Sequence, residues 1–152
     1  MNEWIRKSSC IFELSENSLT AYEKLCRPVC RELGLNQTAF DILMFLANNP
    51  QYQTAGDIVK VRHLKPNLVS FHVERLVQEG YLVREGVPGD RRKVRLLCTE
   101  KVRPVVERGR KAQEEFGMRM TQGIDEEALR RQWELMSAMS RNVEKMLADE
   151  KL

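Results

Sequence analysis

The sequence predicts a mainly α-helical chain with one small β-hairpin. Three observations predict this class. Two short helical patterns, at 54–62 and 66–79, follow one another with only a short turn between them, and a pair of strand patterns comes next. Apolar stripes at helical spacing occupy 9–33 and 100–150. This order is typical of a winged helix-turn-helix, at 36–99, flanked by N- and C-terminal helices.

The first expected helix covers residues 9–33. Its apolar positions recur every seven residues and comprise Phe12, Leu19, Cys26 and Leu33. A seven-residue repeat gives a helix a continuous seam for packing against another helix. Gly34 is the expected end of this helix, as glycine is the commonest residue just after a helix.

A second helix is expected to begin after an N-cap formed by Asn36. Its apolar residues are Phe40, Leu43, Met44, Leu46 and Ala47. The run Asn48-Asn49-Pro50 ends it, because the residue before a proline disfavours helical backbone. Residues 51–53 then lead into the helix-turn-helix.

Thr54 and Asp57 open the first helix of the pair. We expect the Thr54 hydroxyl to accept from the backbone N–H of Asp57, while the Asp57 carboxylate reaches back toward Thr54. This is a capping box with aspartate in place of the usual glutamate or glutamine. A helix of about eight residues is not stable alone, so neighbouring elements must pack against this one.

The second helix of the pair is expected to begin near Pro66, because proline suits the first helical position. Its buried face is formed by Leu68, Val69, Val73, Leu76 and Val77, and Gly80 ends it. The opposite face, with Lys65 just before the helix, presents Asn67, Ser70, Phe71, Glu74 and Arg75. Such side chains can bind base edges or phosphates. Taken alone, the pattern fits a DNA-reading face and an ordinary solvated face equally well.

Two strands are expected at 81–85 and 93–98, where apolar and polar residues alternate. The loop between them is rich in glycine and proline and ends in Asp90, Arg91 and Arg92. We expect Asp90 to hold the Arg92 guanidinium extended. A basic loop tip suits a narrow minor groove, where the potential is most negative. The alternative is a solvated surface loop, which the position after a helix-turn-helix disfavours.

This segment resembles the MarR (multiple antibiotic resistance regulator) family. The resemblance is carried by Val69-Ser70, Glu74-Arg75-Leu76, Gly80-Tyr81-Leu82-Val83-Arg84, Asp90-Arg91-Arg92 and Cys98-Thr99-Glu100-Lys101. The Asp-Arg-Arg wing followed by Thr-Glu-Lys is its most specific part, and the similar helix layout extends from Phe12 to Leu147. The resemblance implies a dimeric bacterial transcription regulator, often a repressor released by small phenolic or carboxylate ligands, oxidants or metals.

The sequence departs from the family pattern at two places. Phe71 stands where the family often carries arginine, so it either contacts a thymine methyl group or packs against the fold. Val102 replaces the usual glycine after Thr-Glu-Lys, and Pro104 follows. With Thr99 as N-cap, Pro104 falls at the fifth helical position, where its missing N–H costs a backbone bond. We therefore predict that regular helix begins at Pro104 or is kinked there.

Length and charge agree with this interpretation. The 152 residues fit one domain, 1–152, with a substantial core. The net charge is +3, but residues 50–99 hold nine Lys and Arg against five Asp and Glu, so the positive excess lies in the proposed DNA-binding segment. No apolar run has the length of a signal peptide or a transmembrane helix. We expect a cytoplasmic protein with no membrane partner.

The helices at 9–33 and 100–150 carry more apolar surface than a small winged-helix core can cover. In the last helix, for which Asp125 is the expected N-cap, this stripe comprises Leu129, Trp133, Met136, Met139, Val143, Met146 and Leu147. The economical partner is a second copy in a two-fold dimer, and a closed bundle within one chain is the alternative. We expect a homodimer on a pseudo-palindromic operator in double-stranded DNA.

The sequence predicts no enzyme, no metal site and no cofactor. It contains no P-loop, no Gly-rich dinucleotide turn, no HExxH and no nucleophile elbow. Cys26 and Cys30 are one helical turn apart, but Cys26 lies on the apolar stripe, so packing is preferred over redox sensing or metal binding. Cys10 lies near the place where peroxide-sensing relatives keep a reactive cysteine, although this sequence aligns Phe12 there. Neither histidine forms a ligand spacing with a cysteine.

We therefore predict a homodimeric, sequence-specific DNA-binding transcription regulator that acts as a ligand-responsive repressor. The alternatives are a protein–protein adaptor that keeps the fold without binding DNA, and a cysteine-based redox-sensing regulator. Ligands of the family bind between the dimerisation helices and the DNA-binding segment. For a small aromatic or phenolic effector, the candidate lining residues are Phe12, Tyr22, Phe40 and Met44, and a filled core is the alternative.

Overall fold

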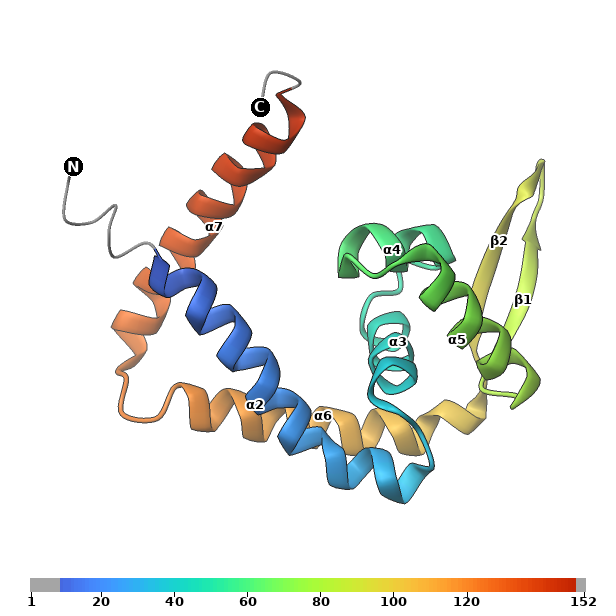
Figure 1. Cartoon of the computed structure of the whole chain (residues 1–152), viewed down its shortest axis with the longest axis horizontal. Coiled ribbons are helices and arrows are strands. Elements are labelled where there is room, and N and C mark those ends of the chain that lie inside the picture. The colour runs from blue at the N-terminus through green and yellow to red at the C-terminus, as the bar shows by residue number, and fades with distance from the viewer. Residues whose placement is uncertain (1–8, 150–152) are drawn as a thin grey trace. The chain divides into compact units, whose positions relative to one another are not determined.

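The computed structural model describes residues 9–149, which divide into two compact units, the first ending at Glu114 and the second beginning at Glu115. The elements in chain order are α2 (Ser9–Leu33), α3 (Gln37–Asn48), α4 (Ala55–Arg62), α5 (Pro66–Gln78), β1 (Leu82–Val87), β2 (Asp90–Cys98), the 3₁₀ helix η1 (Glu100–Val102), α6 (Arg103–Met120) and α7 (Glu126–Ala148) (Figure 1). The expected fold class, mainly helical with one hairpin, is confirmed.

Helix α3 supplies more residues to the core of the first unit than any other element does. Asn36 caps it as predicted, since its Oδ1 accepts from the backbone N–H of Ala39 at 2.8 Å. The buried residues of this helix are Ala39, Phe40, Ile42, Leu43, Met44, Phe45 and Leu46. Full burial of one large apolar side chain is worth about 1.5–3 kcal/mol. Helices α2 and α5 and strand β2 all contact α3, so α3 is the support on which they are arranged.

Gly109 brings the first half of α6 close to α3. A Cβ atom at this position would lie 2.7 Å from the Met44 Cε and 3.1 Å from the Phe40 Cζ. The two side chains therefore fill the space that any other residue at 109 would need. Close packing of this kind leaves little room for adjustment, as protein interiors are about as dense as organic crystals.

The capping box that was expected at the start of α4 is confirmed. The Thr54 Oγ1 accepts from the Asp57 backbone N–H at 3.1 Å, and the Asp57 Oδ2 accepts from the backbone N–H groups of Thr54 and Gln53 at 2.9 and 3.0 Å. Burial raises the pKa of Asp57, but these hydrogen bonds outweigh it and lower the pKa. Of the eight residues of α4 only Ile58 is buried, and Ala55 and Val59 pack partly buried against the core. The cap and these side chains together hold a helix that is too short to persist alone.

The hairpin differs from the expectation. The two strands pair antiparallel from Leu82 opposite Cys98 to Gly86 opposite Val94, and then Val87 lies opposite Asp90. Both strands are longer than predicted, because Pro88 and Gly89 alone make the turn. The arginines expected in a loop lie within β2, in a bulge formed by Arg91, Arg92 and Lys93. The base of the hairpin is anchored by Leu96, which is buried and whose N–H donates to the Gln53 carbonyl at 2.7 Å.

The prediction about Pro104 is confirmed to within one residue. Thr99 caps a single turn of 3₁₀ helix at Glu100–Val102, and α-helix begins only at Arg103. Pro104 therefore lies in the first turn of α6. The N–H groups of a first turn have no acceptor within the helix, so the missing N–H of proline costs no helical hydrogen bond there.

The buried cysteines are packing residues, as expected. Cys26 is completely buried and Cys30 nearly so, both in the core of the first unit. Burial raises the pKa of both thiols, that of Cys30 to about 11. Cys10 and Cys98 are exposed. Within residues 9–149, no three or more His, Cys, Asp or Glu side chains gather as metal ligands would, and no helix there is long and apolar enough to cross a membrane.

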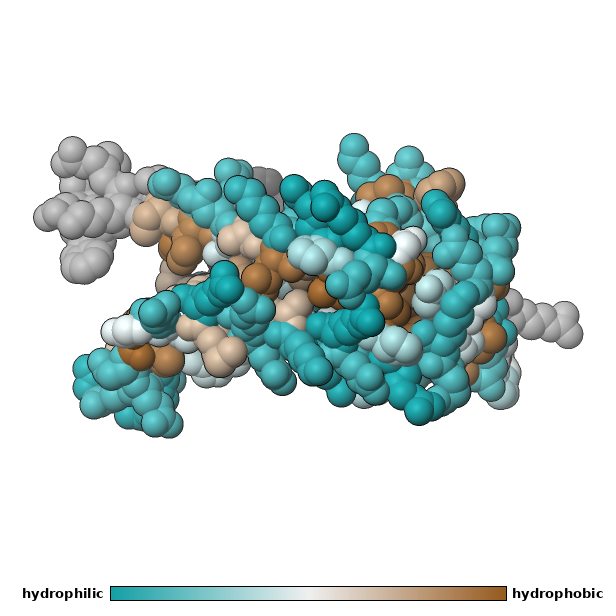
Figure 2. Space-filling view, turned by 90° about the horizontal axis from the view of Figure 1, so that it is seen from below, coloured by the Kyte–Doolittle hydropathy of each residue, from teal (hydrophilic) through white to brown (hydrophobic). Residues whose placement is uncertain are grey.

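The second unit is built around α7. Asp125 caps it, as predicted, by accepting from the Ala128 N–H at 2.9 Å. None of the 23 residues of this helix is buried. Its exposed large apolar residues are Trp133, Leu135, Met136, Met139, Val143, Met146 and Leu147. This helix presents the exposed apolar stripe that the sequence predicted. On the face of the molecule that Figure 2 shows, apolar side chains lie between polar ones.

His72 is a core residue that the sequence pattern did not indicate. It is 6% exposed on the inner side of α5, and its Nδ1 has no hydrogen-bond partner in the described part of the chain. Burial lowers the pKa of His72, and the positive charge of Arg75 lowers it further. The folded chain therefore holds this imidazole in its neutral form more firmly than the unfolded chain does.

We predict that His72 makes the folded chain sensitive to acid. Since its pKa is lower in the folded than in the unfolded chain, stability is full above the unfolded pKa, about 6.5, and falls as the pH drops below it. Urea unfolding of the wild type and of His72→Leu, at a pH about two units above and one unit below that value, measures this. The wild type should lose stability at the lower pH, and His72→Leu should lose less.

The other histidine provides the matched control. His63 is exposed and has a left-handed backbone, with φ of 52°, which asparagine also tolerates. His63→Asn removes an exposed histidine without straining this backbone, so it is the control against which His72→Leu is compared. An equal loss of stability in His72→Leu and in the wild type would contradict the assignment.

Candidate nucleic-acid interface

The outer face of α5 is fixed by the burial of its inner face. Val69, His72, Val73 and Leu76 are nearly inaccessible, so the other residues of this stretch, Ser70, Phe71, Glu74 and Arg75, point outward. The structure accordingly leaves exposed the predicted site residues Lys65, Asn67, Ser70, Phe71, Arg75, Asp90 and Arg92. The side chain of Arg91 lies outside the described part of the chain. Helix α5 and the hairpin belong to the same unit (Figure 1).

The N-terminus of α5 is suited to bind an anion. Pro66 occupies the first turn, and the N-cap residue Lys65 makes no capping hydrogen bond through its side chain. Asn67 partly fills that role, because its Oδ1 accepts from the N–H of Leu68 at 2.9 Å. The partial positive charge of a helix N-terminus, with a lysine beside it, is a favourable site for a phosphate group.

Phe71 is not a packing residue. Its side chain is 61% exposed, and its ring meets the edge of the His72 ring at a centroid distance of 5.2 Å. The ring therefore lies outside the core, and its contact with DNA stays a prediction. Its chemistry is that of an apolar contact, such as one with a thymine methyl group.

Two ion pairs occupy the polar face of α5. The Arg75 Nε lies 2.7 Å from Glu79 within the helix, and the Arg84 Nη2 lies 2.7 Å from Glu74 and connects β1 to α5. The hydrogen bond and the charge of Arg84 lower the pKa of Glu74. The sequence does not predict this pairing of Arg84, because its partner lies ten residues away on another element and no periodic pattern connects the two.

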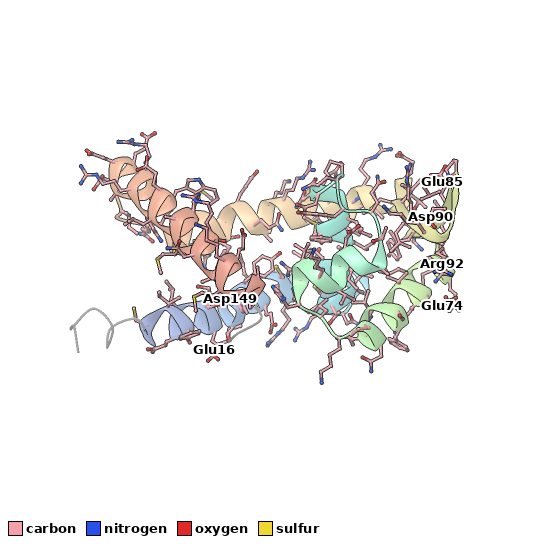
Figure 3. All side chains as sticks on the ribbon, turned by 90° about the horizontal axis from the view of Figure 1, so that it is seen from above. Glu16, Glu74, Glu85, Asp90, Arg92 and Asp149 are labelled. Carbon is pink, nitrogen blue, oxygen red and sulfur yellow. The ribbon has the colours of Figure 1, made fainter. Side chains whose placement is uncertain are left out.

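Asp90 does not hold the Arg92 guanidinium as we expected. Its Oδ1 instead accepts from the backbone N–H of Arg92 at 3.0 Å. An aspartate readily reaches the N–H two residues later in the chain, so it stabilises the backbone of the bulge and leaves the arginine side chain to be directed by that backbone. Asp90 and Arg92 lie at the hairpin end of the unit, with Glu85 on the neighbouring strand (Figure 3).

Of the four residues considered for an effector site, Tyr22, Phe40 and Met44 lie in or against the same core, and Phe12 lies apart from them. Phe40 and Met44 are fully buried against Gly109. Tyr22 is partly buried and accepts from the Gln113 Nε2 at 3.3 Å, and burial raises its pKa. Phe12, more than two helical turns away on α2, is 75% exposed. Within this chain, Phe40 and Met44 are part of a filled core.

Comparison with known proteins agrees with the resemblance to the MarR family. Residues 33–93 match the sequence model of the MarR family. A search of curated protein sequences found no match. A MarR transcriptional regulator from Methanosarcina mazei Go1 is similar in structure with a TM-score of 0.71 and 22% identity, over 95% of this chain and 99% of that one.

Two further solved structures share the fold. A MarR-family transcriptional regulator from Listeria monocytogenes, in complex with a 26mer DNA, has a TM-score of 0.74 and 16% identity, over 94% of this chain and 90% of that one. CouR from Rhodococcus jostii RHA1, bound to p-coumaroyl-CoA, has a TM-score of 0.67 and 18% identity, over 86% and 88%. The sequence match over residues 33–93 confirms the resemblance to the MarR family, and the chain carries the winged helix-turn-helix fold of that family's solved structures.

Proposed function

We propose that this protein is a homodimeric, sequence-specific regulator of transcription that binds double-stranded DNA. The observation that carries the proposal is the exposed face of α5, which has an uncharged polar end at Asn67 and Ser70 and lies in the same unit as a hairpin with three consecutive basic residues, Arg91, Arg92 and Lys93. Base-reading groups on a helix, together with cations on a wing, are the two components of winged-helix recognition.

The residues of this surface divide by chemistry. Asn67, Ser70 and the exposed ring of Phe71 are suited to base edges in the major groove. Lys65, the N-terminus of α5 and the basic bulge are suited to phosphates and to the negative potential of the minor groove. Arg75 must exchange its Glu79 partner for a phosphate or a base before it contributes. The likeness to a structure solved with DNA supports this arrangement.

A second copy of the chain is the partner that we propose for the apolar stripe of α7. None of the described residues of this helix is buried, and seven of its large apolar residues are exposed. A two-fold dimer would cover the stripe and present two α5 helices to DNA. It would also double the basic excess of residues 50–99, which is modest in a single chain.

Repression that is relieved by a small aromatic effector is the finer part of the proposal. It is supported by the family resemblance and by the likeness to CouR, which was solved with p-coumaroyl-CoA. Since Phe40 and Met44 are closed in the core, the exposed Phe12 and the partly buried Tyr22 are the candidate residues that a ligand can reach without repacking of the core.

Selection of bound sequences from random duplex DNA tests the main proposal. In a two-fold dimer the α5 helices enter successive major grooves about 34 Å apart, so the selected site should be a pseudo-palindrome with half-sites about 10 bp apart, centre to centre. Selected sites without a dyad would contradict the dimeric mode of binding. No enrichment at all would favour the alternative of a protein–protein adaptor that has kept the fold.

The wing gives a prediction about salt dependence. Arg92→Ala should weaken binding to the selected site and to random duplex by a similar factor, because this arginine is expected to act on phosphate and groove potential. The slope of log K against log salt should fall by about 0.9 for each phosphate that is no longer neutralised. Fluorescence anisotropy at a series of salt concentrations measures both quantities. An unchanged affinity and slope in a folded dimer would contradict the role of the wing.

Ser70→Ala is the matched change on the helix. The hydroxyl carries no charge, so the salt slope should stay at the wild-type value. Discrimination between the selected site and its single-base variants should fall by about 1–3 kcal/mol at the position read by Ser70. A uniform loss across all sequences would assign Ser70 to the phosphate backbone instead.

The dimer proposal is tested on α7. Val143→Glu places a carboxylate in the apolar stripe, and an unpaired buried charge costs several kcal/mol, so the dissociation constant of the dimer should rise by about 100-fold or more. Arg141→Glu introduces the same side chain on the opposite face of the helix and should leave the dimer intact. Sedimentation velocity over a range of concentrations distinguishes the two. Equal dissociation of both variants, or of neither, would remove α7 from the proposed interface.

A further inference from the structure

The C-terminal end of α5 is closed by a regular backbone pattern. The Tyr81 N–H donates to the Leu76 carbonyl at 2.9 Å, and the Gly80 N–H donates to the Val77 carbonyl at 3.0 Å. Gly80 has φ of 77°, the left-handed conformation that this Schellman motif requires and that glycine adopts without strain. The chain therefore leaves the helix in a fixed direction and enters β1 at Leu82.

The carbonyl groups that follow are bound by one distant segment. The Lys101 Nζ donates to the Glu79 carbonyl at 2.7 Å, the Thr99 Oγ1 donates to the Gly80 carbonyl at 2.7 Å, and the Thr99 N–H donates to the Tyr81 carbonyl at 3.0 Å. Three successive acceptors at the end of α5 are thus satisfied by residues 99–101. This is the Thr-Glu-Lys run that carries part of the family resemblance. It is not among the residues that we propose to contact DNA.

Lys101 makes two contacts through one ammonium group. Its ammonium binds the C-cap carbonyl and also lies over the Tyr81 ring, 4.3 Å from the ring centroid. A cation is favoured at a helix C-terminus by the helix dipole and over an aromatic face by the ring quadrupole. The next residue, Val102, is buried in the core, so the backbone that carries Lys101 is anchored.

The position of Lys101 separates it from the base-reading groups. Asn67 and Glu79 are twelve residues apart on α5, which corresponds to about 18 Å along the helix axis. The ammonium is at the end of α5 opposite to the one where we place the bases. It is also directed at a carbonyl and a ring on its own chain, which hold it at this end of the helix.

We propose that Lys101 is a positioning residue for DNA recognition, which fixes the end of α5 and the base of the hairpin to the start of α6 without neutralising a phosphate. The inference rests on the proposed function. Because η1 runs directly into α6 at Arg103, the direction of α5 is set by the same segment that begins α6. A disturbed end of α5 would tilt the base-reading face, and selectivity would suffer before general affinity for DNA.

Lys101→Met tests the proposal, since methionine keeps an unbranched stem and removes both the charge and the donor. Binding to the selected duplex should weaken by about tenfold, the factor expected when one charge-assisted hydrogen bond is removed. Binding to random duplex and its salt slope should stay unchanged. Lys101→Arg, which keeps a cation and a donor, should restore the selected-site affinity to within about twofold, a difference too small to represent a missing hydrogen bond.

Lys93→Met is the positive control for a phosphate contact. It removes an exposed lysine from the basic bulge of the hairpin, so it should lower the salt slope by about 0.9 for each phosphate left unneutralised and weaken binding to both duplexes. Lys101→Met would overturn the inference if it behaved in the same way, or if it changed neither affinity. A measured unfolding midpoint for each variant excludes loss of the fold as the cause.

The outcome also separates this inference from the proposed function. A wild-type protein that binds neither duplex at low salt overturns the function, and the positioning role with it. A wild-type protein that prefers the selected duplex, together with a Lys101→Met variant of unchanged preference, overturns only the role of Lys101. Faster hydrogen exchange of the Gly80 and Tyr81 amides in Lys101→Met would further support the loss of a fixed helix end.

Discussion

The packing of α5 and α6 on α3 is the constraint on which the rest of the structure depends. The inner residues of α5, Val69 and Val73, are buried in the same core as Phe40 and Leu43 of α3, and Gly109 lets α6 approach Phe40 and Met44 closely. Apolar burial has no direction of its own, but side chains packed at near-crystal density admit few alternative arrangements. The outward face of α5 is therefore defined by what lies behind it. The polar residues on that face are therefore held in place by the packing behind the helix and do not have to hold each other.

The sequence correctly predicts the features that depend on neighbouring residues. The capping box of Thr54 and Asp57, the N-caps at Asn36 and Asp125, and the delayed start of α6 before Pro104 each depend on residues within a few positions of one another. Hydrogen bonds of this range follow from backbone geometry, so a sequence is sufficient to predict them. The same holds for Cys26 and Cys30, whose spacing placed them on one face of α2.

The features that the sequence did not reveal all join distant residues. His72 lies at helical spacing with Val69 and Leu76 on α5, but a polar imidazole at such a position does not by itself predict burial. The pairing of Arg84 with Glu74 and the contact of Lys101 with the end of α5 cross from one element to another. The bulge at Arg91, Arg92 and Lys93 depends on how the two strands align, and glycine, proline and basic residues in a row fit a longer loop equally well. Tertiary contacts decided each of these features.

The ion pairs on α5 have a consequence for how such a protein would search DNA. Arg75 and Arg84 each already hold a carboxylate in the free chain. A phosphate must displace that carboxylate, so the net gain from either arginine is a difference between two similar pairings and is smaller than that of a free cation. Weak binding to non-specific duplex DNA shortens the time that the protein stays at each site. More of the binding free energy then comes from the groups that distinguish bases. The acidic residues beside the arginines would in this way speed the passage of the protein along the duplex.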